Sequence, residues 1–476
     1  MSVPLSEGVG ELLMFYSKSP AAAPYAGTEE QKRKRFKRMQ WSSFLAITIG
    51  YSMYYVCRTS LNVVKKPIMD AGVLDASQLG LISSALLFTY AIGKFINGFL
   101  ADHSNIRRFM ATGILISTVA NIIVGVLGLL TLRQTLISIS AFYVIFAILW
   151  GINGWAQSMG APPSIVALSR WYDDAHRGTF YGFFSASHNL GEFFSFLFVG
   201  GLVSLFGWQY GFIGAAVAGA IGVILIVCFL YDSPESQGLP SPSMPKDKPA
   251  GDASVGKAQL SVLRNPYVWV LAFASAFMYI SRYAVNGWGV LYLQEAKGYE
   301  LASATQIISI NALLGIIGTV FSGWLSDVVF RGNRYIPAVT AGVLEVIALV
   351  LFAFGGNALW VNILAMVLFG IAIGVLICFL GGLMAVDIVP REASGAALGV
   401  VGIASYAAAG LQDIASGLLI DGHKTLVSAA GEPEVFRYDF TYALWFWIIA
   451  AVLSVLLVTI VWHKARRKPR KDEVLR

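Results

Sequence analysis

Long apolar segments separated by short charged loops make up most of this chain. Twelve apolar runs are separated by charged or Gly/Pro-rich breaks. Each run is long enough for a bilayer-crossing helix of about 20 residues. They lie at 41–63, 77–101, 109–130, 135–160, 179–204, 209–231, 266–291, 302–326, 336–354, 358–386, 394–420 and 440–463. We therefore predict an all-α membrane protein with twelve transmembrane helices.

Composition agrees with this pattern. Hydrophobic residues make up 57% of the chain and charged residues only 13%, whereas soluble domains carry about 25% charged residues. The three cysteines all lie in apolar segments, which argues against a disulfide framework or a metal cluster. The net charge of +7 gathers at the two ends and in short loops. We interpret this charge as a topology signal and expect no nucleic-acid partner.

Breaks in composition divide the chain into five parts. We predict an N-terminal extension, a first bundle, a linker rich in Pro, Ser, Gly and Lys, a second bundle and a basic tail, at 1–40, 41–231, 232–265, 266–463 and 464–476. The order of charges expected of a signal peptide is missing from the first part, so no cleavable leader is expected. Strongly basic loops alternate along the chain with less basic ones. The positive-inside rule then places both termini on the cytosolic side of a cell membrane.

A charged loop motif occurs once in each half. Asp102 precedes Arg107 in the first half, and Asp327 precedes Arg331 in the second. The two aspartates, each four residues after a glycine, are 225 positions apart. This repeat predicts two duplicated, pseudo-symmetric six-helix bundles. We interpret the four charged residues as a gating clasp between helix ends, not as substrate ligands.

Two arginines lie deep inside apolar segments at equivalent places of this repeat. Arg58 and Arg282 are 224 positions apart, and a charge in the middle of a span costs about 2.5–3.5 kcal/mol on insertion scales. Duplicated membrane carriers bind their substrates near the bilayer midplane where the halves meet. We therefore predict that both arginines bind an anionic ligand there. The alternative is that each snorkels or pairs with a carboxylate, but no acid lies near them in the predicted first and seventh helices.

Several stretches carry a family resemblance. They are Tyr51-x-x-x-Tyr55-x-x-Arg58, Tyr90-Ala-Ile-Gly-Lys94, Gln157-Ser-Met-Gly-Ala-Pro-Pro163, Ser187-His188-Asn189-Leu190-Gly191, Tyr279-x-x-Arg282 and Asn286-Gly-Trp288. The repeated loop motif resembles the signature of the major facilitator superfamily. Beyond residue 40 the chain resembles the organophosphate:phosphate antiporters, the group of hexose-6-phosphate and glycerol-3-phosphate transporters. The resemblance implies the major facilitator fold.

The resemblance also implies roles for individual residues. A phosphate would be held between Arg58 and Arg282, with Lys94 and His188 lining the cavity. Five tyrosines occupy positions that the family uses around that pocket: Tyr51, Tyr55, Tyr90, Tyr279 and Tyr406. Four polar residues in apolar spans could reach sugar hydroxyls or equally satisfy backbone groups at helix breaks: Gln157, Asn286, Gln412 and Asp413.

Three departures from the family pattern affect the expected pocket. Thr59 stands where the family often has a lysine, which removes one positive charge. Leu398 and Val401 stand where hexose-phosphate transporters can carry an Asp and a Lys, and the related receptor also lacks that pair. Glu192 follows His188 by four residues, on the same helical face. We predict a His188–Glu192 pair that favours the charged imidazole; the alternative is a carboxylate that faces a neighbouring helix.

Together these features predict a secondary antiporter that exchanges a phosphorylated sugar, hexose 6-phosphate first, for inorganic phosphate by alternating access. The alternatives are a glycerol-3-phosphate antiporter and a non-transporting sensor of hexose phosphate. We expect no enzyme activity, no cofactor and no metal, because no nucleophile or acid–base set is evident. The expected partners are the two phosphate compounds and the lipid bilayer, for a monomer; only the sensor would need a signalling partner.

Overall fold

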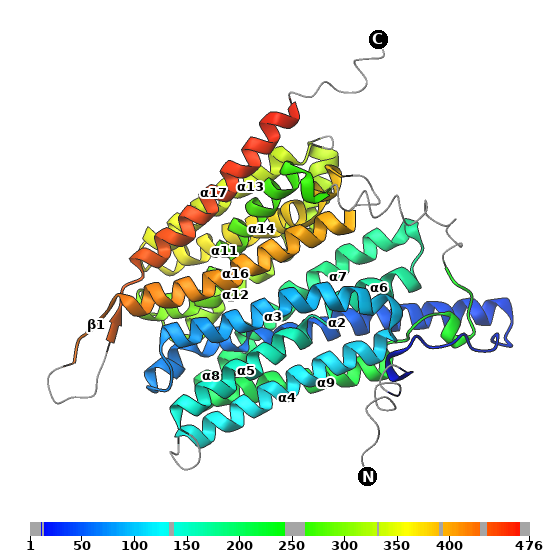
Figure 1. The fold of residues 1–476 in the computed structure, drawn as a ribbon, viewed down its shortest axis with the longest axis horizontal. Coiled ribbons are helices and arrows are strands. Elements are labelled where there is room, and N and C mark those ends of the chain that lie inside the picture. The colour runs from blue at the N-terminus through cyan, green and yellow to red at the C-terminus, as the bar shows by residue number, and fades with distance from the viewer. Residues whose placement is uncertain are drawn as a thin grey trace. The chain divides into compact units, whose positions relative to one another are not determined.

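The computed structural model describes residues 11, 14–132, 138–242, 262–330, 333–389, 394–428 and 436–466. Helices form nearly all of this part of the chain (Figure 1), so the predicted all-α class is confirmed. In the described residues, eleven helical segments are long and apolar enough to cross a membrane. The remaining predicted span lies in helix α2, whose middle carries Arg58 and several hydroxyl-bearing side chains that lower its hydropathy.

The first half contains the following elements. They are α2 (Glu29–Asp70), α3 (Ala76–His103), α4 (Ile106–Leu132), α5 (Ile139–Gln157), α6 (Ala161–Trp171), α7 (Asp174–Phe194), the π-helix η1 (Ser195–Val199), α8 (Gly200–Phe206), α9 (Trp208–Phe229) and the short 3-10 helix η2 (Glu235–Gln237). Helix α2 begins well before the predicted span at 41–63, so the basic run at 32–38 is helical. The predicted helix at 135–160 ends at Gln157, and α6 begins one turn later with prolines in its first turn, where a missing N–H is tolerated.

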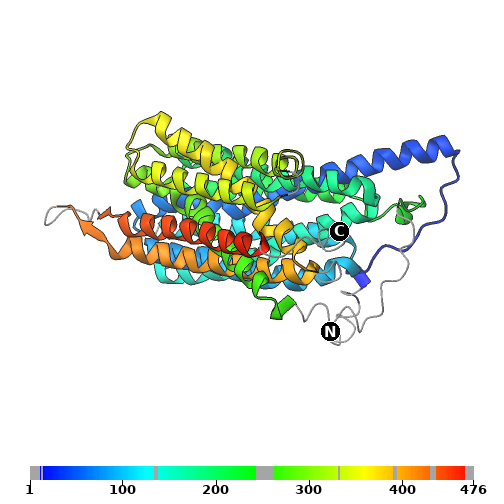
Figure 2. The ribbon, with the colours of Figure 1, turned by 90° about the horizontal axis from the view of Figure 1, so that it is seen from above.

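The second half has α11 (Pro266–Glu295), α12 (Leu301–Trp324), η3 (Leu325–Val329), α13 (Tyr335–Phe354), α14 (Leu359–Cys378), η4 (Phe379–Leu383), α15 (Met384–Asp387), α16 (Ser394–Gly422) and α17 (Thr441–Arg466). Strands β1 (Lys424–Leu426) and β2 (Phe436–Tyr438) form an antiparallel pair between α16 and α17. Figure 2 shows the helices of this half from above. The predicted span at 358–386 is interrupted by η4, and this internal break was not predicted.

The helices form two compact units that divide α2 and α3 between them. Unit 1 holds residues 1–60 and 88–247, and unit 2 holds residues 61–87 and 248–476. The last turns of α2 and the first turns of α3 therefore pack with the helices of the second half.

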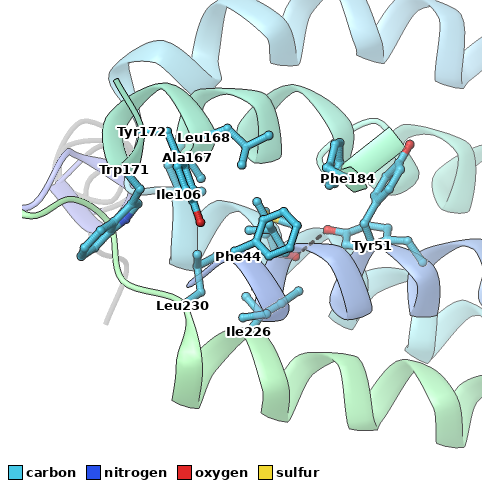
Figure 3. Close-up of a cluster of buried hydrophobic side chains, with 14 of the residues drawn as sticks. Phe44, Tyr51, Ile106, Ala167, Leu168, Trp171, Tyr172, Phe184, Ile226 and Leu230 are labelled. Atoms are coloured by element: carbon cyan, nitrogen blue, oxygen red, sulfur yellow. Dashed lines mark hydrogen bonds between the residues drawn. The ribbon is translucent and has the colours of Figure 1, made fainter. Parts of the chain in front are cut away.

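Unit 1 is held together around α4, which packs against α5, α6 and α9. A buried apolar cluster fills one end of this unit (Figure 3), with Phe44 from α2, Leu168 and Trp171 from α6, and Ile226 and Leu230 at the end of α9. A Cβ added at Gly128 would lie 2.3 Å from the ring of Trp208. Small residues of this kind let membrane helices approach closely.

Unit 2 repeats the pairing of unit 1. In each half the third long helix packs against the fourth and the sixth: α4 against α5 and α9, and α13 against α14 and α17. Helices α12 and α14 touch through their backbones, because a Cβ at Gly370 would lie 2.3 Å from the carbonyl oxygen of Asn311. The recurrence of these pairings supports the duplication that the sequence motifs predicted.

Candidate functional site

Arg58 lies on α2 in unit 1 and is 5% exposed. Its guanidinium carbon is 4.4 Å from the ring centroid of Tyr90 on α3 and 5.3 Å from that of Tyr55, three residues earlier in α2. Tyr51 follows in the same aromatic row, with its ring centroid 5.5 Å from that of Tyr55. A planar cation beside aromatic faces is stabilised by cation–π attraction. The structure thus brings together four of the predicted site residues.

His188 on α7 joins this group. Its ring centroid is 5.7 Å from that of Tyr55, and the side chain is half-buried. Helix α7 can lie this close to α2 because residue 191 is glycine, where a Cβ would be 2.3 Å from the carbonyl oxygen of Ser52. Glu192, one residue on, is buried in unit 1, whereas Lys94 on α3 is half-buried. The predicted His188–Glu192 pair stays a prediction.

Arg282 occupies the corresponding place on α11 in unit 2. It is 4% exposed, and its guanidinium carbon lies 5.8 Å from the ring centroid of Tyr279 and 5.4 Å from that of Tyr283. Tyr406 on α16 packs edge-on against Tyr279, with 5.3 Å between the centroids. Tyr283 was not among the predicted site residues. Its signal was its position next to Arg282, one helical turn after Tyr279.

The two arginines share a local pattern. Each follows a tyrosine by three residues, Tyr55 before Arg58 and Tyr279 before Arg282, and each has a second tyrosine ring within cation–π distance. A guanidinium binds two phosphate oxygens at once and stays charged at any physiological pH. Neighbouring phenol groups can donate further hydrogen bonds to the same oxygens. Each unit therefore carries chemistry suited to a phosphate or another oxyanion.

The polar residues that were weighed as contacts to sugar hydroxyls have structural partners. Gln157 is 1% exposed, and its amide donates to the carbonyl oxygen of Tyr54 at 2.9 Å and to Ser117 Oγ at 3.0 Å. Gln412 donates to Ser416 Oγ one turn later in α16. Thr59, the departure from the family pattern, donates its hydroxyl to the carbonyl oxygen of Tyr55. The satisfaction of backbone groups, the alternative left open above, thus describes Gln157.

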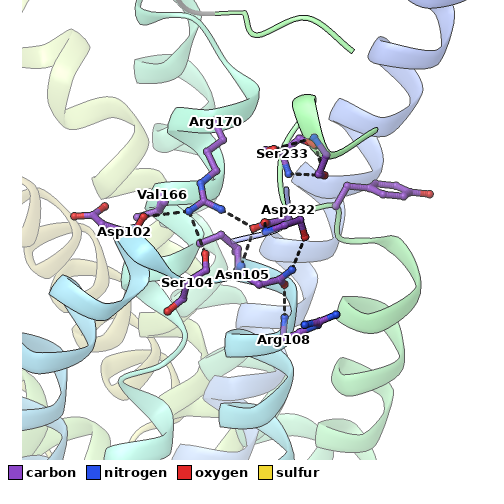
Figure 4. Close-up of polar contacts among 12 residues, drawn as sticks. Asp102, Ser104, Asn105, Arg108, Val166, Arg170, Asp232 and Ser233 are labelled. Atoms are coloured by element: carbon purple, nitrogen blue, oxygen red, sulfur yellow. Dashed lines mark hydrogen bonds and ion pairs between the residues drawn. The ribbon is translucent and has the colours of Figure 1, made fainter. Parts of the chain in front are cut away.

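Asp102, one of the predicted gating residues of unit 1, lies in a polar cluster at the junction of α3 and α4 (Figure 4). Asp102 contributes its backbone carbonyl oxygen, which accepts from Arg170 at 3.3 Å. The carboxylate partner of Arg170 is Asp232, after α9, at 2.5 Å. Within the described residues no ion pair joins the Asp102 side chain to Arg107. The Arg170–Asp232 ion pair at this junction was not predicted from the sequence.

The equivalent cluster of unit 2 is described in part. Arg331 and the side chain of Asp327 lie outside the described residues. Arg334, which precedes α13, forms an ion pair with Asp387 at the end of α15, with 2.9 Å between the charged atoms. A basic residue at the start or end of a helix therefore pairs with an acid from a later segment in both units.

Residues 14–25 of the N-terminal extension pack against the polar cluster of unit 1 at the junction of α3 and α4. The backbone N–H of Asn105 donates to the carbonyl oxygen of Tyr16 at 2.7 Å, and the backbone N–H of Ser19 donates to Asp232 Oδ2 at 2.9 Å. Arg108 donates to the carbonyl oxygen of Phe15 at 2.8 Å. This part of the extension thus packs as a component of unit 1.

Glu345, in the middle of α13, is a buried carboxyl that sequence reasoning missed. It is 0% exposed and accepts a short hydrogen bond from Ser281 Oγ, the neighbour of Arg282 in α11. Its second oxygen has no hydrogen-bond partner among the described residues. An ionised carboxylate without a counter-ion is costly in a membrane interior, so the neutral acid suits this position. Glu345 thus contacts the turn of α11 that carries Arg282.

A pair of substitutions separates hydrogen bonding from charge at this position. We expect Glu345→Gln to keep the bond from Ser281 and to preserve the unfolding temperature in detergent. Glu345→Ala removes this bond, which leaves Ser281 only its bond to the carbonyl oxygen of Met278, and opens a cavity, so we expect a loss of roughly 2–5 kcal/mol of stability. Thermal unfolding of the purified variants measures both. A larger loss for the glutamine variant than for the alanine variant would show that the ionised form is required.

Comparisons with known proteins place the chain among membrane transporters. Residues 47–412 match the family described as the Major Facilitator Superfamily. The chain is 30% identical over 84% of its length to the membrane sensor protein UhpC of Salmonella typhimurium, of which the match covers 89%. It is 32% identical to a probable hexose phosphate transport protein of Chlamydia pneumoniae, over 79% of this chain and 84% of that one. A glycerol-3-phosphate transporter of Bacillus subtilis is 29% identical over 91% and 94%.

The fold also matches solved structures. A bacterial homolog of the human lysosomal transporter Spinster, in an inward-facing and unoccupied conformation, matches with a TM-score of 0.66 and 17% identity. The match covers 89% of this chain and 95% of that one. Similarity at this level of identity concerns the fold alone, and it confirms the architecture predicted from the repeated loop motif.

Proposed function

Because the chain belongs to the major facilitator superfamily and, within it, to the organophosphate:phosphate antiporters, we propose that it exchanges a phosphorylated sugar for inorganic phosphate. Hexose 6-phosphate is the first candidate, since a probable hexose phosphate transport protein and a membrane sensor protein are among the similar chains. Glycerol 3-phosphate is the second, since a glycerol-3-phosphate transporter matches over most of its length. Superfamily members are transporters and not enzymes, in agreement with the lack of a predicted nucleophile.

The observation that carries this proposal is the buried arginine with paired tyrosines in each unit. Arg58 and Arg282 are both less than a tenth exposed, and both present a guanidinium next to phenol rings. A phosphate dianion offsets two positive charges that are otherwise costly to hold in the membrane interior. The loaded carrier then changes conformation more easily than the empty one. That asymmetry favours exchange over one-way transport.

Inorganic phosphate and a phosphate ester share the group that the arginines bind. Each can therefore serve as the counter-substrate of the other, and uptake of the ester follows the outward phosphate gradient. His188, beside Tyr55, can donate a hydrogen bond to the same oxygens when it is charged. Lys94 adds a further cation on α3. We propose these four basic residues as the phosphate-binding set, with the tyrosines orienting the arginines.

Reconstitution tests the proposed exchange. Proteoliposomes that contain inorganic phosphate are expected to take up labelled phosphate or labelled glucose 6-phosphate, whereas vesicles without internal phosphate take up little. Competition by glucose 6-phosphate, glycerol 3-phosphate and 3-phosphoglycerate against phosphate exchange then ranks the esters. Uptake that is equally fast with and without internal phosphate would contradict exchange. Strong competition by glycerol 3-phosphate alone would favour the second substrate candidate over the first.

A non-transporting sensor is the second candidate function. The sensor of Salmonella typhimurium is among the similar chains, and Leu398 and Val401 stand where hexose-phosphate transporters can carry a charged pair. Binding and exchange separate the two functions. A purified protein that is stabilised against thermal unfolding by glucose 6-phosphate, but does not exchange phosphate in vesicles, would be a sensor.

The membrane orientation belongs to the same proposal. Basic residues are concentrated in alternate loops and at both ends, and the positive-inside rule places such loops in the cytosol. We therefore place both termini on the cytosolic side of the cell membrane. Residues 14–25 and the Arg170–Asp232 pair would then lie at the cytosolic end of unit 1.

A further inference from the structure

Unit 2 contains a buried ion pair that the proposed phosphate site does not use. Lys65 near the end of α2 is 0% exposed, and its Nζ lies 4.0 Å from Asp413 Oδ1 on α16. The same Nζ is 3.5 Å from the ring centroid of Trp288 on α11. The indole N–H of Trp288 donates to Asp413 Oδ1 at 2.9 Å. Three helices thus meet at one lysine, one carboxylate and one indole.

Two glycines make room for this cluster. A Cβ at Gly287 would lie 3.2 Å from Asp413 Oδ1 and 3.7 Å from Lys65 Nζ. A Cβ at Gly80, in the first turns of α3, would lie 2.4 Å from the backbone carbonyl oxygen of Asp413. Residues 61–87 therefore pack tightly on α11 and α16, and the ion pair lies inside this contact.

Each member of the pair lies about two helical turns after a residue of the proposed phosphate site. Lys65 follows Arg58 by seven residues in α2, and Asp413 follows Tyr406 by seven residues in α16. Seven residues are almost two full helical turns, so each lies on the same helix face about 10 Å further on. The pair is thus a separate feature of the faces that carry the substrate residues.

Residues 61–87 belong by sequence to the first repeat but pack in unit 2. In duplicated carriers, one half moves against the other during alternating access. In such a cycle the contact between residues 61–87 and α11/α16 has to open and close. Opening it would expose Lys65 and Asp413 to water, where both charges regain their hydration.

We propose that the Lys65–Asp413 pair makes this contact reversible; the proposal rests on the exchange function proposed above. A buried ion pair holds a contact less strongly than well-packed apolar side chains of similar volume, because its desolvation offsets much of its attraction. The charges therefore specify the closed contact through Trp288 and still allow it to open at each cycle. Lys65 and Asp413 are positioning residues for the conformational change, not ligands of the phosphate.

This role predicts opposite effects for single and double substitutions. Lys65→Met or Asp413→Asn leaves the other side chain buried without its partner charge, so the closed contact weakens. Lys65→Met combined with Asp413→Asn removes both charges and their desolvation cost, while the asparagine side-chain oxygen still accepts from Trp288, so the closed contact strengthens and exchange slows. If the pair merely stabilised the fold, the single and double variants would not change the opening of this contact in opposite directions.

The experiment measures phosphate exchange and the accessibility of a cysteine at Ser83. Ser83 is 6% exposed and lies one turn after Gly80 on α3; the native cysteines are replaced by alanine. We expect the single variants to raise the labelling rate of Ser83→Cys by a membrane-impermeant maleimide at least about tenfold, and the double variant to lower both labelling and exchange at least about tenfold. Thermal unfolding verifies that each variant is folded, and Lys65→Arg, which keeps the charge, is expected to retain exchange.

The neighbouring pair supplies the matched control. Lys66 forms ion pairs with Glu295 on α11 and with Asp70, but it is partly exposed. We expect Lys66→Met with Glu295→Leu to change exchange and labelling less than about threefold, because a partly exposed pair is more screened by water than the fully buried Lys65 pair. Wild-type exchange and labelling in the Lys65/Asp413 double variant would overturn the inference while leaving the exchange function intact. Absence of exchange in the wild-type protein would instead overturn the proposed function.

Discussion

Replacing Arg282 with alanine is expected to reduce phosphate exchange by at least about 100-fold, because two charge-assisted hydrogen bonds of roughly 1.5–3 kcal/mol each are lost. Replacing it with lysine keeps the charge but loses the planar fork that binds two oxygens at once. We expect the lysine variant to retain about a tenth of the exchange rate or less. The same order of exchange rates among the variants is expected for Arg58, since each arginine has a tyrosine three residues earlier.

Exchange in proteoliposomes with internal phosphate measures these variants. Arg437→Ala is the matched control, because Arg437 is exposed on strand β2 and its removal should leave exchange within about twofold of the wild type. Equal exchange in Arg282→Lys and the wild-type protein would show that charge alone suffices. Wild-type exchange in Arg282→Ala would remove the arginine from the site.

The buried arginines and the architecture could be predicted because their signals are local or repeated. A single charge in an apolar run is visible at its own position, and the repeat supplied its partner. The same rule applied to α13 would have found Glu345, a lone carboxyl inside the predicted span at 336–354. Tyr283 could not be distinguished in this way, since tyrosines in such chains more often pack or lie at the interface.

Pairings between distant segments could not be predicted. Arg170 and Asp232 are 62 residues apart, and no local pattern in the sequence links them. Lys65 is separated from Asp413 by most of the chain, and the glycines that let their helices approach are ordinary in membrane segments. Helix interruptions, such as η4 after Cys378, likewise depend on packing. Side-chain partners of this kind follow from the fold and not from any local pattern.

Replacing Asp232 with alanine is expected to destabilise unit 1 by roughly 3–5 kcal/mol, because one member of a buried ion pair is removed. The carboxylate is 5% exposed and binds three donors from three segments: Arg170, the backbone N–H of Ile106 at 2.9 Å and the backbone N–H of Ser19 at 2.9 Å. Its loss leaves those groups without their acceptor. Asp232→Asn keeps one acceptor oxygen and no charge, so an intermediate loss is expected. Thermal unfolding in detergent measures the series.

Glu235 provides the control for this prediction. It stands three residues after Asp232 in η2, is half-exposed, and uses its backbone carbonyl oxygen, not its carboxylate, to accept from Ala22. Glu235→Ala is therefore expected to change stability by less than about 0.5 kcal/mol. Removing residues 1–26 also deletes the Ser19 donor but leaves the Arg170 pair, so its loss should be smaller than that of Asp232→Ala. A truncated protein as unstable as Asp232→Ala would show that the N-terminal segment, and not the ion pair, holds this end of unit 1 together.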